Sequence, residues 1–218
     1  MKKFLTILVL VFATTTLAHA QFGIIGGYTL SNAKAQGWND VTLKNMSQFH
    51  AGVAYRIKMG PFFVLQPELT YEAKGSTIKE VISGQDLTSL ATQSGYVELG
   101  LAAQAGIDLL AVRPFIVAQP FVGYQVYGRE NYQAAGIEFA DINDYLAQAK
   151  NKFEWGFGVG GGIDLLNHLQ FSVQWFMNIG QLFNENALNK DVEKAILVSD
   201  YKKVQAYQGV KFTLGIFF

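Results

Sequence analysis

Hydrophobic and polar residues alternate along most of this chain, and the pattern is clearest at its C-terminal end. In residues 208–218 every second residue is apolar, and the residues between them are small or polar. A period of two indicates a β-strand with one apolar face, because successive side chains of a strand point to opposite sides. Eight segments show this alternation and are predicted to be strands. They are residues 22–30, 48–58, 61–74, 94–108, 113–128, 152–165, 168–180 and 204–218.

Short and long connections alternate between these predicted strands. The turns near residues 58–61, 109–112 and 166–168 are tight, whereas four other connections are long. The long connections are residues 31–47, 75–93, 129–151 and 181–203. Short periplasmic turns and long extracellular loops are typical of outer-membrane barrels. The sequence therefore predicts an all-β fold: an eight-stranded, antiparallel, up-and-down transmembrane β-barrel with both termini on the periplasmic side.

The two faces of the predicted strands differ as a membrane barrel requires. The apolar face carries no charge at mid-strand, which suits contact with hydrocarbon. Its residues Tyr71, Tyr124, Phe153 and Trp155 lie toward the long loops, where aromatic girdles occur. The other face is polar and would fill the narrow lumen of an eight-stranded barrel.

A polar network inside the lumen is the main structural prediction about individual residues. Its predicted members are Arg56, Gln66, Glu68, Glu98, Gln104 and Lys211. Unpaired buried charge is costly, so we expect at least one of the two acids to pair with one of the two bases and the network to block water. Glu72, Lys74 and Glu154 have the same parity but lie near the loop end, so a solvent-facing position is open for them.

The N-terminus predicts export. Lys2 and Lys3 precede an apolar run that is too short to span a bilayer, and the small residues Ala18 and Ala20 form a signal-peptidase site before Gln21. Residues 1–20 are therefore predicted to be a cleaved signal peptide and residues 21–218 the outer-membrane barrel domain. The chain has no cysteine, which excludes a lipoprotein signal, disulfides and thiolate metal sites.

Composition argues against other classes of protein. Removal of Lys2 and Lys3 with the signal peptide leaves 15 basic residues against 17 acidic ones, so we expect no nucleic acid partner. Half of the residues are hydrophobic, yet no segment after the signal has the eighteen or so consecutive apolar residues of a transmembrane helix.

Three features of the sequence resemble cofactor-binding, metal-binding or catalytic motifs. Residues 156–161 match the G-x-G-x-x-G pattern, but strand alternation continues through them and no helix follows to hold a pyrophosphate. His50 and His168 lie far apart without a serine or carboxylate motif beside them. Inward carboxylates could in principle act as general acids or bases, but a lumen ion-pair network explains them more simply. We expect no catalysis, cofactor or metal.

Two of the long connections have the pattern of short helices. Residues 143–149 combine a capping residue with good helix formers, and Leu188, Val192 and Ile196 are spaced four apart. These helices would cover the rim of the barrel or form part of a recognition surface.

Several segments resemble the PorT-like family of outer-membrane β-barrel proteins. They are residues 49–53, 63–71 with 74–75, 96–99, 120–124, 157–162 and 214–218, and the Gln-Pro-Glu-Leu-x-Tyr element at 66–71 is the most specific. The resemblance covers the whole predicted mature chain, and Phe218 matches the terminal aromatic residue of such barrels. It implies the barrel fold and an outer-membrane location, and it supplies no catalytic residues.

The leading functional prediction is a non-enzymatic outer-membrane barrel with a filled lumen that acts through its extracellular loops as an envelope or surface interaction protein. A small-solute porin and a soluble periplasmic ligand-binding barrel are the alternatives. The expected partners are outer-membrane lipid, the barrel-assembly machinery, and an extracellular protein or glycan bound by the loops 31–47, 75–93, 129–151 and 181–203. We expect the protein to be a monomer.

Overall fold

The computed structural model describes residues 20–35, 41–82, 85–134, 137–138, 143, 147, 150–166, 168–179 and 204–218. The predicted signal peptide lies almost wholly outside these residues, although Ala20 and Gln21 already belong to the first strand. The described part of the chain is nearly all β-structure. Its strands are β1 (Ala20–Ala35), β2 (Val41–Met59), β3 (Phe63–Ile82), β4 (Gln85–Gly106), β5 (Val112–Ala134), β6 (Ile137–Glu138), β7 (Phe153–Leu165), β8 (Leu169–Ile179) and β9 (Val204–Phe217).

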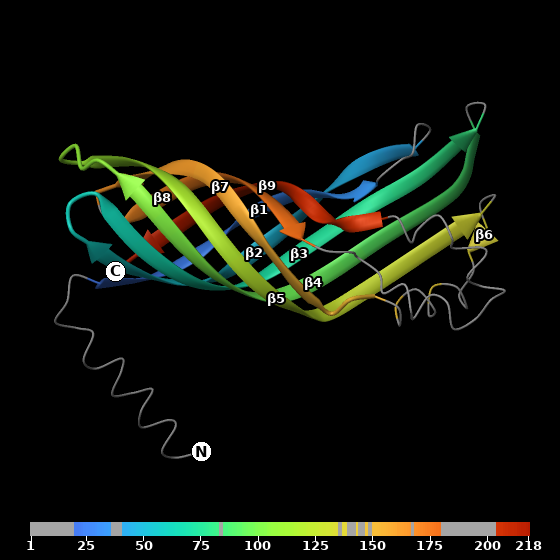
Figure 1. Ribbon diagram of the computed structural model, residues 1–218, viewed down its shortest axis with the longest axis horizontal. Coiled ribbons are helices and arrows are strands. Elements are labelled where there is room, and N and C mark those ends of the chain that lie inside the picture. The colour runs from blue at the N-terminus through green and yellow to red at the C-terminus, as the bar shows by residue number, and fades with distance from the viewer. Residues whose placement is uncertain are drawn as a thin grey trace, which may run out of the picture.

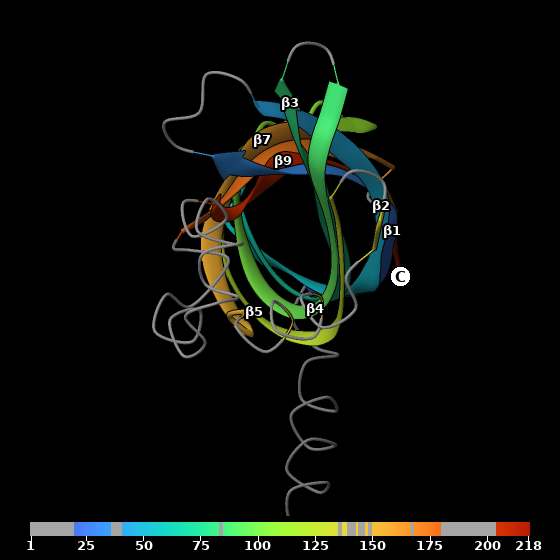
Figure 2. The same cartoon turned by 90° about the vertical axis from the view of Figure 1, so that its right-hand side faces the viewer.

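Eight of these strands form a closed antiparallel barrel. Each strand pairs with its neighbour in sequence, and β5 pairs with both β4 and β7. The barrel closes where β1 pairs with β9, for example Gly23 with Phe217. Figure 2, which looks into the barrel from one end, shows the strands arranged as a ring. β6 is a two-residue addition to the outer end of β5. The predicted up-and-down barrel is therefore confirmed.

The predicted faces are also confirmed. Outward residues are exposed along every strand; Val97, Leu99 and Leu101 of β4, for example, are 41%, 58% and 42% exposed. Inward residues are buried, and many of them are polar or charged. This is the reverse of a soluble domain, in which large apolar side chains gather inside. An outer face of this kind requires a hydrocarbon environment.

Five strands, β1 to β5, are longer than the alternation predicted. β2, β3, β4 and β5 continue beyond the other strands and project at one end of the barrel (Figure 1). Most of residues 75–93, which were predicted to be a loop, are in fact the paired outer halves of β3 and β4. Residues 31–35 and 41–47 likewise belong to β1 and β2. The alternation fades here because the projecting strands no longer have one face against hydrocarbon, although their backbone pairing continues.

The predicted loop helices fall mostly outside the described residues. Asn143 and Ala147 adopt helical conformation, and the remaining residues of 143–149 and the whole segment around Leu188 are not described. At the opposite end of the barrel the turns are tight. Gly60 occupies the left-handed region with φ of 79°, a conformation that glycine adopts without strain.

The glycine-rich strand β7 has the register that the sequence predicted. Gly158 lies opposite Phe176 and Gly160 opposite Gln174 on β8. A Cβ atom at Gly160 would come within 2.7 Å of the Cα atom of Gln174, so the close approach of the two backbones requires glycine at this position. The G-x-G-x-x-G segment is therefore continuous strand, and no helix follows it to receive a phosphate.

Candidate functional site

The lumen near the tight turns is filled by a cluster that we call the arginine layer. It comprises Arg56, Arg113, Asp164, Gln66, Gln104 and Gln170, all at most 5% exposed. Arg56 Nη2 lies 3.0 Å from Asp164 Oδ1, and Arg113 Nη1 lies 2.9 Å from Asp164 Oδ2. One carboxylate thus bridges two guanidinium groups. Such charge-assisted contacts are among the strongest hydrogen bonds in proteins.

Amide side chains extend the arginine layer across the lumen. Gln66 accepts hydrogen bonds from Gln104 at 3.1 Å and donates to Gln170 on the opposite wall, also at 3.1 Å. Gln170 in turn donates to Asp164 Oδ1 at 2.9 Å. Arg56 also donates to Gln21 at 3.2 Å, and its guanidinium lies 3.8 Å above the Phe217 ring. The layer therefore joins strands from all sides of the barrel.

A second cluster, which we call the lysine layer, lies further toward the projecting strands. Its members are Lys74, Lys211, Glu72, Glu98 and Glu154. Lys74 donates to Glu98, and to Glu154 at 2.8 Å. Lys211 lies 3.0 Å from Glu72 and 4.0 Å from Glu98. Since Glu72, Lys74 and Glu154 are at most 6% exposed, they belong to the lumen and do not face solvent.

Two aromatic rings separate the charges of the lysine layer. The ammonium nitrogen of Lys74 lies 4.7 Å from the centre of the Phe121 ring and 5.0 Å from that of Phe176. The Lys211 nitrogen lies 5.8 Å from both ring centres. Cation–π attraction adds to the ion pairs where water is excluded. The rings also occupy the lumen at this level.

His50 is a structural member of the lumen wall. Its Nδ1 and Nε2 atoms lie 3.0 Å from the hydroxyl oxygens of Thr29 and Thr213, respectively, and Nδ1 is 3.8 Å from Glu72. His168 lies in a turn on the outside, and its Nδ1 is 2.9 Å from the carbonyl oxygen of Phe217. The two histidines share no site.

The lumen is also occupied beyond the lysine layer, toward the projecting strands. Lys150, which follows the undescribed part of the long β6–β7 connection, is 5% exposed and donates to Ser94 at 2.6 Å. Its ammonium also contacts the Tyr207 hydroxyl at 3.3 Å, and that hydroxyl lies 2.9 Å from the Thr92 hydroxyl. This hydroxyl-rich cluster lies beyond the lysine layer.

The predicted network residues all point inward, and the expected pairing of at least one of the two acids with one of the two bases is present. Only Lys211 and Glu98 form a pair among the four combinations named from sequence. Arg56 binds Asp164, and Glu68 accepts hydrogen bonds from Gln66 and Gln119 with no cation within 4.0 Å among the described residues. Gln104 accepts a hydrogen bond from Arg113 at 3.1 Å.

Asp164, Arg113, Lys150 and Tyr207 are lumen residues that sequence reasoning missed. Parity alone would have placed Asp164 and Arg113 inside, since each continues the inward series of its strand. They were overlooked because they stand beside tight turns, where solvent contact is the usual expectation. Lys150 has no such signal, because it precedes β7 in an irregular segment.

The residues at the predicted ends of the mature chain lie at the seam of the barrel. Ala20 begins β1 opposite Ile57, and Gln21 lies opposite Arg56. Ala18 is outside the described residues. Phe218 is 70% exposed, and its backbone N–H donates to the carbonyl oxygen of Phe22 at 2.8 Å.

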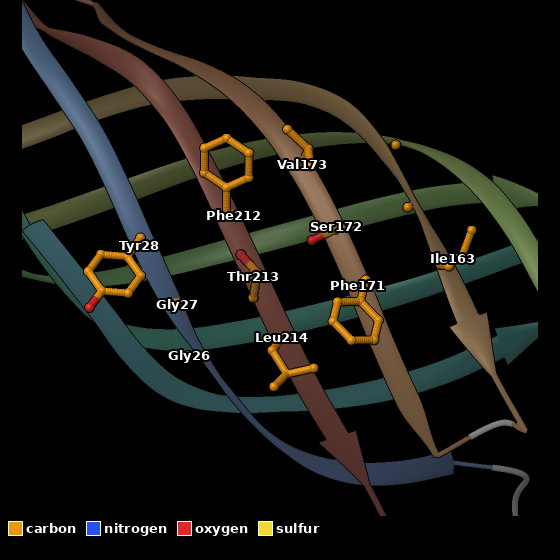
Figure 3. A pocket seen from close by; sticks show the side chains of 12 residues that line it. Gly26, Gly27, Tyr28, Ile163, Phe171, Ser172, Val173, Phe212, Thr213 and Leu214 are labelled. Carbon is orange, nitrogen blue, oxygen red and sulfur yellow. The ribbon is translucent and has the colours of Figure 1, made fainter. Parts of the chain in front are cut away.

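The outside of the barrel bears an apolar groove across β1, β9, β8 and β7 (Figure 3). Its volume is about 700 Å³, and outward side chains such as Phe171, Phe212 and Leu214 form its walls. In Figure 3 the smaller residues Thr213 and Ser172 lie between these walls. The residues that line the groove include no charged side chain.

The described residues contain no group of three or more histidine or acidic side chains that could hold a metal ion. No helix among them is long and apolar enough to cross a membrane.

Comparisons with known proteins cover most of the chain. A family model described as outer membrane protein beta-barrel domain matches residues 14–184. No characterised protein sequence matches the chain. Among solved structures, Neisserial surface protein A (NspA) is 13% identical, with 91% of this chain and 97% of that one covered and a TM-score of 0.42. The attachment invasion locus protein Ail of Yersinia pestis is 11% identical (91% and 99% covered, TM-score 0.43), and OprG of Pseudomonas aeruginosa is 12% identical (91% and 96% covered, TM-score 0.43).

Proposed function

Because the chain belongs to the outer membrane protein β-barrel domain family and is an outer-membrane barrel, we propose that it is a non-enzymatic surface interaction protein with a closed lumen. In this proposal the barrel anchors and orients the projecting strands, and recognition takes place outside the membrane. Small-solute conduction is the competing function that the experiments must exclude.

The packed lumen is the observation that carries this proposal. The arginine layer and the lysine layer each extend across the bore, and their members are at most 9% exposed on their side chains. A solute that passed through would have to displace buried ion pairs, which would leave charges uncompensated at a cost of roughly 3–5 kcal/mol for each pair. An eight-stranded barrel has no additional width around such side chains.

The projecting strands supply the surface for recognition. Residues 126–129 of β5 are exposed on both faces, so this segment stands clear of the barrel interior. It includes Tyr127, which is 49% exposed, and the exposed cation Arg129. Tyrosine and arginine are the residue types most enriched where proteins recognise one another. A protein or an acidic glycan would suit this surface.

Export, membrane insertion and orientation are also part of the proposed function. The protein would be exported by cleavage before Gln21, inserted by the barrel-assembly machinery, and embedded as a monomer in outer-membrane lipid. Within its family, the Gln-Pro-Glu-Leu-x-Tyr element at 66–71 supports a place among the PorT-like members. The projecting strands would face the cell exterior and the tight turns the periplasm.

Planar-bilayer recording tests the closed lumen. We expect purified protein to give no steady single-channel conductance. Heat-dependent gel migration of protein recovered from the same membranes shows whether it was inserted and folded. An absence of conductance that results only from failed insertion can therefore be recognised. Steady, uniform conductance steps from folded protein would overturn the proposal in favour of a porin.

Single-cysteine variants test the orientation and the recognition surface, since the chain has no cysteine of its own. In intact cells we expect a membrane-impermeant maleimide to label Arg129→Cys but to label Asp108→Cys, at the turn end, only after lysis. A photo-crosslinker attached at position 129 should then capture a discrete partner that the same crosslinker at position 108 does not. Labelling of position 108 alone in intact cells would reverse the proposed orientation.

A further inference from the structure

A small water-accessible space lies inside the lumen beside Glu68. This side chain points inward at mid-barrel and is nevertheless partly exposed. The residues on both sides of it along the lumen are closed to solvent, with Gln66 of the arginine layer 1% exposed and Glu72 of the lysine layer 0%. An inward residue between two closed layers can be exposed only to an internal space.

Other inward residues at the same height in the lumen also keep some solvent exposure. Thr70 is 7% exposed, Ser172 and Gln174 are each 6%, and Lys211 is 8%. Gln66, Gln170 and Glu72, by comparison, are 1%, 2% and 0% exposed. The walls at this level include glycines of β7, which have no side chain to fill the bore.

Glu68 is the one carboxylate among the described lumen residues with no cationic partner within 4.0 Å. Gln66 and Gln119 donate to its two oxygens, each at 2.7 Å. These amide donors orient the carboxylate, but they carry no charge. The two layers and Glu68 together contain four cations, from two arginines and two lysines, and five carboxylates. Of these five acids, Glu68 alone has no cation within 4.0 Å in the part of the chain that the structure describes.

The oxygens around the space suit a small hard cation. Gln174 is 6% exposed, and its Oε1 atom has no hydrogen-bond partner. This atom lies 3.1 Å from the position that a Cβ of Gly158 would occupy. Strand pairing leads from Glu68 to Asn178 of β8 in one direction round the barrel, through Gly100, Phe121 and Gly156, and to His168, just before β8, in the other, through Ala54, Gly23 and Phe217. The middle of β8, which carries Gln174, therefore lies across the lumen at the height of Glu68. Thr70 and Ser172 carry further hydroxyl oxygens at this level.

From this geometry we propose that the lumen binds one monovalent alkali cation between the arginine and lysine layers, with the Glu68 carboxylate as its charged ligand and the Gln174 carbonyl oxygen as a neutral one. Hard cations prefer oxygen ligands, and divalent ions in proteins usually take more than one carboxylate, whereas a single carboxylate with neutral oxygens matches a single positive charge. The site is separate from the external recognition surface, so either proposal can fail without the other.

Two measurements on the detergent-solubilised mature protein test this site. The first is the temperature at which the folded gel band is lost, in sodium chloride and in N-methylglucamine chloride at equal ionic strength. A ligand that binds only the folded state stabilises it by mass action, so we expect a sodium-dependent rise of roughly 3–6 °C at ten times the dissociation constant. The second is anomalous diffraction from crystals grown in thallium or rubidium salt, with a peak expected beside the Glu68 carboxylate.

Glu68→Gln and Asp108→Asn form the matched pair of variants. Both remove one negative charge, but Asp108 is 56% exposed at the turn end. We expect Glu68→Gln to fold, to lose the sodium dependence and to show no peak, and Asp108→Asn to keep both. Equal transition temperatures in the two salts with no peak would overturn the proposal, as would a peak or a sodium dependence that persists in Glu68→Gln.

Discussion

The two charged layers of the lumen handle buried charge in opposite ways. In the arginine layer two cations share one acid, and neutral amides accept further hydrogen bonds from the guanidinium groups. In the lysine layer two cations are surrounded by three acids and two aromatic rings. The planar guanidinium has five donors and can bind an acid and several amides at once, whereas an ammonium group acts as a compact point charge. A guanidinium group can therefore be accommodated by a shared acid and neutral amides, whereas the ammonium groups are surrounded by acids and aromatic rings.

This comparison predicts that the arginine layer depends most strongly on a single residue, Asp164. Replacement of Asp164 by Asn would remove the acid that two buried guanidinium groups share, and would leave Arg113 beside only the exposed Asp108. We expect a loss of about 3–5 kcal/mol in the free energy of unfolding, measured by urea titration of the folded gel band. Asp108→Asn is the control, because Asp108 is exposed and lies 3.8 Å from Arg113. Equal losses in the two variants would show that Asp164 does not have this central position.

The lysine layer should tolerate the loss of one member better. In Lys211→Met, Glu72 would still accept a hydrogen bond from Thr29, and Glu98 would still pair with Lys74. We expect a loss of about 3 kcal/mol, at the lower end for a broken buried pair. Adding Glu72→Gln should restore part of the stability, because it removes the uncompensated acid. A double variant no more stable than Lys211→Met would contradict the assigned pairing.

The space between the layers depends on the glycines of β7. A methyl group at Gly160 would meet the backbone of β8, whereas one at Gly161 would meet only the Phe115 carbonyl oxygen, at 3.0 Å. We expect Gly160→Ala to cost about 1–3 kcal/mol and Gly161→Ala distinctly less, by the same urea titration. If the two variants were equally stable, close packing of β7 and β8 would not be what fixes glycine at position 160.

The smallest expected effect comes from exchanging the type of cation while keeping its charge. Arg56→Lys would keep an ion pair with Asp164 but lose the contacts to Gln21 and Gln66 and the stacking over Phe217. We expect a cost of about 1–2 kcal/mol. A neutral effect would mean that charge alone, and not the guanidinium geometry, matters in the arginine layer.

The barrel and its two faces could be predicted from sequence because a period of two determines which side of a strand each residue occupies. The register of β7 against β8 could also be predicted, since one tight turn fixes it. The partners inside the lumen could not. Arg56 and Asp164 are separated by 108 residues and lie on strands that do not pair with each other. Alternation gives a side chain's face, but its height in the barrel depends on strand stagger, which the sequence does not show directly.

The lengths of β2 to β5 were underestimated for a related reason. Their outer halves pair with each other as regular strands but leave the apolar belt, so the hydrophobic signal ends before the hydrogen bonding does. Residues 75–82 and 85–93 are an example, because backbone pairing continues almost to the tip of the hairpin. The hydrophobic alternation therefore shows how much of a strand lies within the membrane, and it does not show how long the strand is.

The seam between β1 and β9 also sets an order of events in time. Strands that are neighbours in sequence can pair as soon as both have been made, but Gly23 cannot meet Phe217 until nearly the whole chain is present. Pairing over such a separation carries the largest loop-closure cost and slows folding. Until then both edges stay open to other chains, and Lys211 cannot reach the acids on β3 and β4. Sealing the barrel and completing its buried charge network are thus a single late step.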